Sequence, residues 1–267
     1  MLTLKNVSKT FGLGTVNEKQ ALNNIDLHLE KGDFVTILGS NGAGKSTLFG
    51  AIAGAFPIDE GSIILDGKDI TAQPDYKRSK YIGRLFQDPL KGTAPSMTIQ
   101  ENLALAYLRA SERRSPFSMI TAADRRDFRD RLAQLDLGLE DRMTQSVGLL
   151  SGGQRQALTL LMATLVTPKL LLLDEHTAAL DPATAEKVLK LTKQIVAEHN
   201  ITCLMITHNI PSALELGNKT IMMNHGQIVL TLEGETRRSL STQQLLDLFK
   251  ANAKGSLETD RVLFSVE

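Results

Sequence analysis

The sequence has no tryptophan, a single cysteine and no excess of charge of either sign. Cys203 alone cannot form an internal disulfide or a zinc cage, which favours a reducing compartment. Thirty basic residues balance thirty acidic ones, so the net charge predicts no attraction to nucleic acid. No apolar run approaches the roughly 18 residues needed to span a bilayer, and the amino terminus lacks the pattern of a secretory signal. If the chain serves a membrane, we expect it to do so from outside the lipid.

The 267 residues are 42% hydrophobic, which is enough for a well-buried core. Short, nearly continuous apolar runs at 34–38, 170–173 and 202–207 predict parallel strands that are covered by helices on both faces. Longer stretches with a 3.6-residue apolar period alternate with them, and this alternation is typical of an α/β protein. Near the carboxyl end, the runs 220–224 and 227–232 flank a His-Gly pair and predict a hairpin.

The segment 88–150 contains helix-start patterns and apolar residues at helical spacing, and it predicts an inserted helical subdomain. Thr98 and Thr121 each stand where a helix N-cap is expected. The mixed charges of 125–131 could suggest a polyanion site, but on an amphipathic helix they more often form a solvated face. The last thirty residues contain a short helix pattern at 244–249 and then a polar tail without a motif.

A glycine-rich loop directly follows the predicted strand 34–38 and precedes a helical run. The order strand, loop, helix is the context that a phosphate-binding P-loop requires. Glycines let the backbone wrap a phosphate, the helix N-terminus binds its oxygens, and a lysine adds a point charge. A glycine-rich helix cap would explain two glycines but not a Lys-Ser pair after the third. The candidate nucleotide-binding residues are Gly39, Ser40, Asn41, Gly42, Ala43, Gly44, Lys45, Ser46 and Thr47, with the Ser46 hydroxyl as a magnesium ligand.

Two carboxylates, Asp174 and Glu175, end the predicted strand 170–173. Open α/β sheets place their ligand crevice at the carboxyl ends of strands, so Asp174 is a candidate magnesium ligand, directly or through water. Glu175 is a candidate base for the water that attacks a γ-phosphate. An acidic loop after a strand is common, and it is the combination with a P-loop that predicts phosphate chemistry.

A second candidate anion-binding surface is Leu150-Ser-Gly-Gly-Gln154 at the start of a helical run. With the P-loop before it and Asp-Glu after it, the chain over about 1–235 resembles the ATP-binding-cassette ATPases, whose signature motif is Leu-Ser-Gly-Gly-Gln. The resemblance implies an α/β P-loop NTPase core with a mostly parallel sheet, an antiparallel β subdomain and the inserted helical subdomain. The implied domains are 1–235 (core 1–87 and 151–235, helical subdomain 88–150) and a carboxyl-terminal helix and tail at 236–267. The implied signature residues are Ser151, Gly152, Gly153 and Gln154.

The resemblance also implies roles for residues outside these motifs. Gln87 matches the glutamine that touches magnesium and the attacking water, and His208 matches the histidine that contacts the γ-phosphate. Asp181 matches the D-loop that links the two sites of a dimer. Phe11 is similarly placed to the aromatic residue that stacks on adenine, although a core phenylalanine is an alternative. The implied catalytic residues are therefore Glu175, His208 and Gln87, and the implied metal ligands are Ser46, Gln87 and Asp174.

The chain departs from the family pattern at His176, where members often carry proline after the glutamate. A histidine there could titrate near the metal, but we interpret it as an ordinary loop residue. The other histidines, His28, His199 and His225, form no metal-ligand spacing and are expected at the surface.

What the resemblance implies about function is an ATPase subunit of a membrane transporter, with ATP and Mg²⁺ as cofactors. Each site would be completed by the signature of a second ATP-binding subunit, and the dimer would work beneath transmembrane permease subunits, peripheral to the cytoplasmic face of the membrane. The phrases 92–98 and 174–182 resemble an importer subgroup that pairs with permeases and receptor proteins for small solutes such as amino acids. Export, and an ATPase scaffold that serves no transporter, remain alternatives. A DNA-repair ATPase is poorly supported, because the P-loop and Asp174 are too close for a long coiled coil between them.

Overall fold

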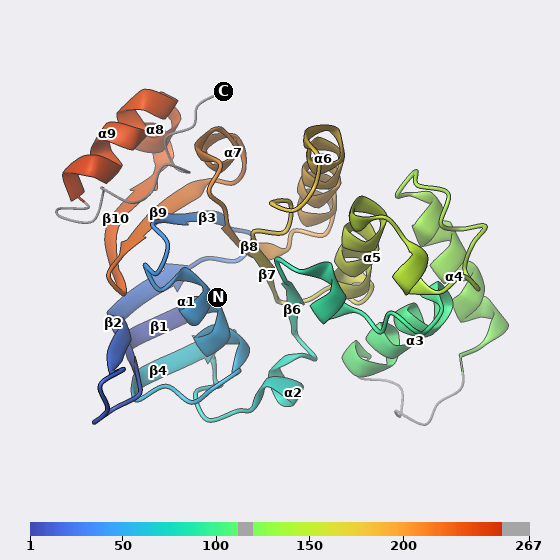
Figure 1. Ribbon diagram of the computed structural model, residues 1–267, viewed down its shortest axis with the longest axis horizontal. Helices are drawn as coiled ribbons and strands as arrows, with labels where there is room; N and C mark the ends of the chain where they lie inside the picture. Colours follow the sequence, from blue (N-terminus) through green and yellow to red (C-terminus); the bar gives the residue numbers. More distant parts are fainter. Residues whose placement is uncertain (112–119, 253–267) are drawn as a thin grey trace. The chain divides into compact units, whose positions relative to one another are not determined.

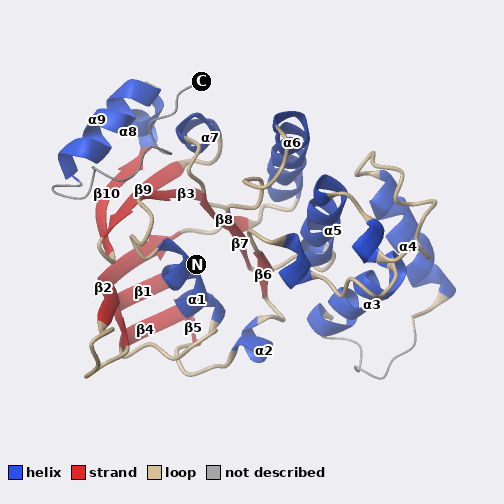
Figure 2. Cartoon of the chain, in the orientation of Figure 1, coloured by secondary structure: helices blue, strands red, loops and turns tan. Residues whose placement is uncertain are grey.

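The computed structural model describes residues 1–111 and 120–252 (Figure 1). The chain divides into two compact units: unit 1 contains residues 1–78 and the chain from 202 onward, and unit 2 contains residues 79–201. Each unit combines strands with helices, as expected for an α/β chain (Figure 2). Within the described ranges, no helix has both the length and the apolar character needed to cross a bilayer.

The first sheet of unit 1 is antiparallel, with the order β2-β1-β4-β5. Its strands are β1 (Leu2–Phe11), β2 (Lys19–Leu29), β4 (Glu60–Leu65) and β5 (Lys68–Asp69). Alternate residues of β1 and β2, such as Leu2, Leu4, Ile25 and Leu27, are buried, because successive side chains of a strand point to opposite faces. This sheet matches the antiparallel β subdomain that the family resemblance implied.

The second sheet of unit 1 has β3 (Phe34–Gly39) between two parallel neighbours, β8 (Thr202–Ile206) and β9 (Lys219–Asn224). All residues of β3 and β8 are buried, which explains their continuous apolar sequences. β10 (Gln227–Glu233) pairs antiparallel with β9 across His225 and Gly226. Both turn residues have positive φ, 45° and 76°, so the predicted hairpin is confirmed.

The helices of unit 1 are α1 (Lys45–Ala53), α2 (Asp75–Arg78), α7 (Ile210–Glu215), α8 (Gly234–Arg238) and α9 (Thr242–Asn252). Two buried arginines satisfy the carbonyls at helix ends. Arg78 donates to the Ala51 and Ile52 carbonyls of α1, and Arg237 donates to the Ala213 carbonyl of α7. The expected helix at 244–249 lies within α9, whereas the tail from 253 lies outside the described residues.

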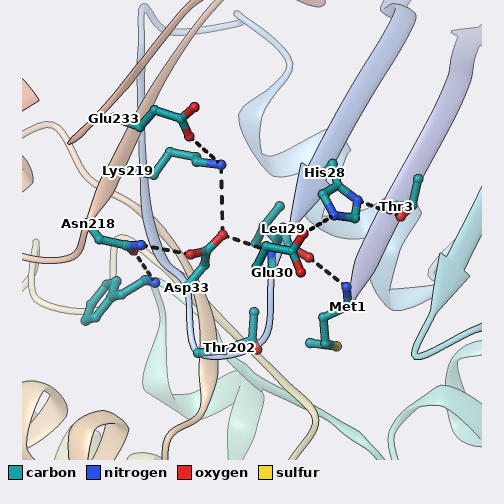
Figure 3. A network of polar contacts seen from close by, with 12 residues as sticks. Met1, Thr3, His28, Leu29, Glu30, Asp33, Thr202, Asn218, Lys219 and Glu233 are labelled. Carbon is teal, nitrogen blue, oxygen red and sulfur yellow. Dashed lines mark hydrogen bonds and ion pairs between the residues drawn. The ribbon is translucent and has the colours of Figure 1, made fainter. Parts of the chain in front are cut away.

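A polar network ties the turn before β3 to the neighbouring strands of unit 1 (Figure 3). The Asp33 carboxylate accepts the Glu30 N–H at 2.9 Å and the Asn218 side-chain amide at 2.8 Å. Lys219 forms an ion pair with Glu233 at 2.8 Å, and its ammonium is 3.9 Å from Asp33. These contacts fix the point at which the chain enters β3 and therefore the strand that leads to the glycine-rich loop.

Unit 2 contains a parallel pair, β6 (Ile82–Leu85) and β7 (Leu170–Asp174). Its helices are α3 (Ile99–Ala110), α4 (Ala122–Ala133), α5 (Gly152–Thr164) and α6 (Pro182–Glu198), with short 3-10 helices at Pro89–Gly92 and Val147–Leu149. A buried apolar cluster joins α3, α4 and α5; its members include Leu103, Phe128, Leu132 and Leu158.

The helix starts expected in unit 2 are confirmed. Thr98 and Thr121 each form a reciprocal capping box, with Glu101 and Asp124 as the partners. On α4, Phe128 is buried while its charged neighbours are exposed, and Arg131 pairs with Asp127 one turn away. The mixed charges of 125–131 therefore form a solvated face, as the sequence predicted.

Candidate functional site

The glycine-rich loop of unit 1 connects β3 to α1 by a path that only glycine permits at two points. Gly44 has a φ of 100°, and a Cβ there would lie 2.5 Å from the Ala21 carbonyl oxygen. A Cβ on Gly39 would lie 2.5 Å from the Met223 carbonyl oxygen. The backbone of the loop therefore packs directly on neighbouring strands, which a side chain at either position would prevent.

The lysine of this loop is folded back over the backbone. Lys45 is 6% exposed, and its ammonium donates to the carbonyls of Gly39 at 2.7 Å and Ser40 at 2.9 Å. These two bonds hold a positive charge within the loop itself. Asn41, Gly42 and Ser46 are exposed, so the loop has an open side.

The first turn of α1 differs from the other long helices in how it begins. α3, α4, α5 and α6 each start with a side-chain cap, whereas α1 starts at Gly44 with no side-chain hydrogen bond. The amides of an α-helix's first turn have no partner within the helix, and a bound anion satisfies them well. The loop and α1 thus combine a glycine backbone, an uncapped helix N-terminus and a lysine, as phosphate binding requires.

The ring of Phe11, at the end of β1, is held at the surface of unit 1. It is 41% exposed and packs edge-to-face on Phe56, with ring centroids 5.1 Å apart. The Lys9 ammonium lies 5.4 Å from the Phe11 centroid and forms an ion pair with Asp59 at 2.7 Å. Asp59 also accepts the Thr10 N–H, and the pKa of its carboxyl is lowered by these hydrogen bonds from Lys9 and Thr10. Phe11 is therefore not a core residue, and one part of its ring is free of protein cover.

His208 follows β8, in the short turn before α7, and is half-buried. Two polar neighbours fix this turn: the Thr207 hydroxyl accepts the Asn209 N–H at 3.0 Å, and the Asn209 side chain caps α7 through the Ser212 N–H at 2.7 Å. The P-loop, Phe11 and His208 all belong to unit 1.

Unit 2 brings the candidate glutamate and glutamine together. Asp174 is the last residue of β7 and is 9% exposed, and Glu175 follows it with a φ of 45°. A positive φ is uncommon for a residue with a side chain, and such strain often marks functional positions. The Gln87 amide donates to the Glu175 carboxylate at 3.3 Å. The two side chains thus contact each other although they lie 88 residues apart in the chain.

A half-buried arginine, Arg84, lies close to the Asp174 carboxylate. The Arg84 guanidinium on β6 stacks over the Phe86 ring at 4.5 Å from its centroid. Burial lowers the pKa of Arg84, and attraction to the Asp174 carboxylate opposes this effect. The opposite charges of Arg84 and Asp174 therefore lie near each other at the carboxyl ends of β6 and β7.

His176 is not the ordinary loop residue that the sequence suggested. It is 2% exposed, its Nε2 lies 3.2 Å from the Thr192 hydroxyl of α6, and burial lowers its pKa to about 4. The ring is therefore neutral at neutral pH and packs under the turn that carries Glu175. His28, His199 and His225 are exposed, as expected.

The candidate signature residues lie at the start of α5 in unit 2. The Ser151 hydroxyl accepts the Gln154 N–H at 3.3 Å, and the Gln154 side chain accepts the Ser151 N–H at 3.2 Å. In this capping box the hydroxyl acts as an acceptor, so its own proton is not used by the cap. Ser151 and Gly152 are exposed, whereas Gly153 is buried against α6. A Cβ on Gly153 would lie 2.1 Å from the Thr184 methyl carbon, so this glycine allows α5 and α6 to approach.

Asp181 begins α6, as the Asp-Pro pair predicted. Its carboxylate accepts the Thr184 N–H at 3.1 Å, and hydrogen bonds from Thr184 lower its pKa. Pro182 occupies the first helical position. Asp181 is therefore an exposed helix cap that remains ionised at neutral pH.

Two side chains that the sequence analysis missed hold the loops around these residues. Arg155 on α5 donates to the carbonyls of Val147, Gly148 and Leu150, and so fixes the segment before Ser151. Asn102 on α3 is 1% exposed; it accepts the Ala94 N–H at 2.8 Å and donates to the Thr98 carbonyl at 2.9 Å. The hydrogen-bond partners of Arg155 and Asn102 are backbone groups, which leave no pattern in the sequence.

The oxygen donors present suit magnesium. The Ser46 hydroxyl, the Asp174 carboxylate and the Gln87 amide oxygen are hard ligands of the kind that Mg²⁺ prefers, and Mg²⁺ usually takes few protein ligands beside phosphate and water. Within residues 1–111 and 120–252, no cluster of three or more His, Cys, Asp or Glu could hold a metal without further ligands. Each of these three oxygen donors is thus of a type that Mg²⁺ accepts beside phosphate and water.

Comparison with known proteins gives consistent matches. The family model described as ABC transporter matches residues 22–178. The chain is 42% identical over 250 residues to a tyrosine transport ATP-binding protein of Clostridioides difficile, covering 94% of this chain and 99% of that protein. It is 34% identical to a phosphonates import ATP-binding protein of Lactobacillus johnsonii, covering 86% of this chain and 89% of that protein.

Solved structures agree with these matches. A dimeric post-hydrolysis state of the ATP-binding cassette MJ0796, bound to ADP and Pi, superposes with a TM-score of 0.76 at 30% identity, covering 87% of this chain and 98% of that chain. The ADP conformation of the cassette MJ1267 superposes with a TM-score of 0.73 at 27% identity, covering 93% and 94%. The family model spans more than half of the chain and the relatives align over most of their length, so this chain belongs to the ABC transporter family, as an ATP-hydrolysing subunit.

Proposed function

We propose that the chain powers the import of a small solute, an amino acid such as tyrosine in the first instance, by binding and hydrolysing ATP beneath a membrane permease. The observation that carries this proposal is the identity of 42% with a tyrosine transport ATP-binding protein along 99% of that protein's length. The phosphonate and methionine import relatives, at 34% and 35% identity, support import as the direction.

The site residues are assigned as follows. The P-loop from Gly39 to Thr47 and the Phe11 ring bind ATP, with the Lys45 ammonium on its phosphates. Ser46, Gln87 and Asp174 hold Mg²⁺, which when bound neutralises phosphate charge and aligns the phosphates.

Glu175 accepts the proton of the attacking water, and its hydrogen bond from Gln87 orients the carboxylate. His208 contacts the γ-phosphate. The Arg84 charge lies next to the Asp174 carboxylate and opposes its negative charge, and the buried, neutral His176 supports the turn that carries Glu175.

A second copy of the chain completes each site. Ser151, Gly152, Gly153 and Gln154 would meet the γ-phosphate bound by the partner's P-loop, with the Ser151 hydroxyl as a donor. Asp181 would link the two sites. We assign 1–235 as the ATP-binding domain, with a core of 1–87 and 151–235 and a helical subdomain at 88–150 that receives the permease, and 236–267 as a carboxyl-terminal extension. The subunit would lie at the cytoplasmic face of the membrane, and a substrate-binding protein would deliver the solute.

Uptake in cells tests the solute and the direction. We expect a strain lacking this gene to lose uptake of labelled tyrosine, wild-type chain to restore it, and Glu175→Gln not to restore it, while uptake of labelled phosphonate stays unchanged. If the strain loses phosphonate uptake and keeps tyrosine uptake, phosphonate is the transported solute. Normal uptake of both tyrosine and phosphonate would favour an ATPase scaffold that serves no transporter. A parallel measurement on the purified chain, ATP affinity of wild type against Lys45→Ala, tests nucleotide binding separately.

A further inference from the structure

The start of β2 forms one wall of the phosphate-binding loop. The Ala21 carbonyl oxygen lies 2.5 Å from the Cβ position of Gly44, so β2 and the loop touch backbone to backbone. Gly226 ties the two together: its carbonyl accepts the Asn23 N–H at 2.9 Å, and its N–H donates to the Ala43 carbonyl at 3.0 Å. Side chains at the beginning of β2 are therefore placed beside the loop.

Lys19 is the first residue of β2 and reaches this loop. Its Nζ lies 3.5 Å from the Cβ position of Gly42, where the exposed loop backbone turns with a φ of 78°. Within the part of the chain that the structure describes, its ammonium has no hydrogen bond or ion pair. The adjacent Glu18 carboxylate accepts the N–H of Gly14, at 2.8 Å, in its own loop.

Lys19 also stands directly across from Phe11. The two residues are paired in the register of β1 and β2, so one cross-strand pair presents an aromatic ring and an ammonium together. The Lys45 ammonium, by contrast, is bound to loop carbonyls inside the fold. The loop is thus approached by two cations from different elements, one buried and one exposed.

We infer that Lys19 is an additional phosphate-binding residue, whose ammonium adds a second cation to the loop and joins the Phe11 ring to the phosphate end of the nucleotide. The inference rests on the proposed binding of ATP at this loop. The exposed ammonium can reach a phosphate oxygen by rotating about its own side-chain bonds, since nothing holds it elsewhere.

Calorimetric titration of the purified chain tests this, with ATP and inorganic tripolyphosphate as the two ligands. Lys19→Met removes the charge and keeps the stem, Lys19→Arg keeps the charge, and Lys31→Met removes an exposed charge at the far end of β2. We expect Lys19→Met to raise the Kd for both ligands about three- to tenfold at low salt. We expect the difference in Kd between Lys19→Met and the wild-type chain to shrink as salt is added. The Kd values of Lys19→Arg should stay near those of wild type, and Lys31→Met should not change them.

Phe11→Ala distinguishes binding of the adenine base from binding of the phosphates. This variant should lower the affinity for ATP and leave the affinity for tripolyphosphate unchanged. The inference is overturned if Lys19→Met binds both ligands like wild type while Lys45→Ala does not, or if it weakens ATP alone or equally at every salt concentration. Absence of ATP binding by the wild-type chain would instead overturn the proposed function.

Discussion

The close packing of Gly153 on Thr184 predicts that Gly153 must be glycine to let α5 approach α6. The free energy of unfolding of Gly153→Ala tests this prediction. A Cβ on Gly153 would lie 2.1 Å from the Thr184 methyl carbon, whereas carbon atoms in contact are about 3.5–4.0 Å apart. Gly153→Ala must therefore push α5 and α6 apart or twist Thr184. Overpacking of this kind costs about 1–3 kcal/mol, against less than about 1 kcal/mol that alanine gains over glycine in a helix.

We therefore expect Gly153→Ala to lower the free energy of unfolding by about 1–2 kcal/mol and the melting temperature by about 2–8 °C. Gly152→Ala is the matched control, because it lies one residue away in the same helix and its Cβ would lie 3.4 Å from a Leu180 methyl carbon. That variant should be as stable as wild type or slightly more stable. Urea unfolding followed by circular dichroism measures both.

A second substitution should relieve the first. Thr184→Ser removes the methyl group and keeps the hydroxyl and the N–H that caps α6 through Asp181. In the Thr184→Ser background, Gly153→Ala should cost less than about 0.5 kcal/mol, so the double-mutant cycle should show a coupling of about 1 kcal/mol or more. If Gly153→Ala is as stable as wild type, or if its cost is the same in both backgrounds, the packing explanation for Gly153 is wrong.

Three further predictions concern the proposed function and the core. Glu175→Gln should keep ATP affinity and lose about 10²–10⁴-fold in turnover, since a general base is removed; turnover within a fewfold of wild type would reject the assignment. Leu90, which is 44% exposed in the 3-10 helix Pro89–Gly92, and the half-buried Met97 both follow Gln87. Changing both to aspartate should abolish co-purification with a membrane protein while ATP binding is kept. Equal recovery of wild type and variant without any membrane protein would contradict this. Cys203 is fully buried and burial raises its pKa, so a maleimide should label it at the rate of unfolding; rapid labelling of the native chain would show that β8 opens locally.

Much of the fold could be predicted because its local signals agree. The buried strands β3, β7 and β8 are continuous apolar runs, and the turn at His225 and Gly226 has the composition that a hairpin demands. The helix caps at Thr98 and Thr121 were visible as a hydroxyl followed three residues later by a carboxylate. Each signal lies within a few residues, where sequence spacing translates directly into geometry.

Contacts between distant segments could not be predicted in the same way. His176 is buried because Thr192, sixteen residues later on α6, lies within 3.2 Å of its ring, and no local pattern reveals that partner. The role of Arg155 could not be predicted because its hydrogen-bond acceptors are backbone carbonyls. Every residue has a backbone carbonyl, so the sequence does not show which ones Arg155 binds. Lys19 lies beside the P-loop because Ala21 of β2 packs on Gly44, and it lies opposite Phe11 because β1 pairs with β2. The sequence analysis assigned neither of these contacts.

The two glycine-rich helix starts of this chain meet different physical demands, although both resemble anion sites in sequence. α1 begins at Gly44, whose φ of 100° excludes a side-chain cap and leaves the first turn to a ligand. α5 begins at Ser151, whose hydroxyl already caps the helix, and its buried glycine serves the packing of α6. At α1 an anion can therefore be bound by backbone amides and Lys45, whereas at α5 the Ser151 hydroxyl can add a directed donor from an exposed corner. In the proposed dimer, a phosphate between two copies would thus be bound mainly at α1 of one copy. The Ser151 hydroxyl at α5 of the other copy would add one hydrogen bond to it.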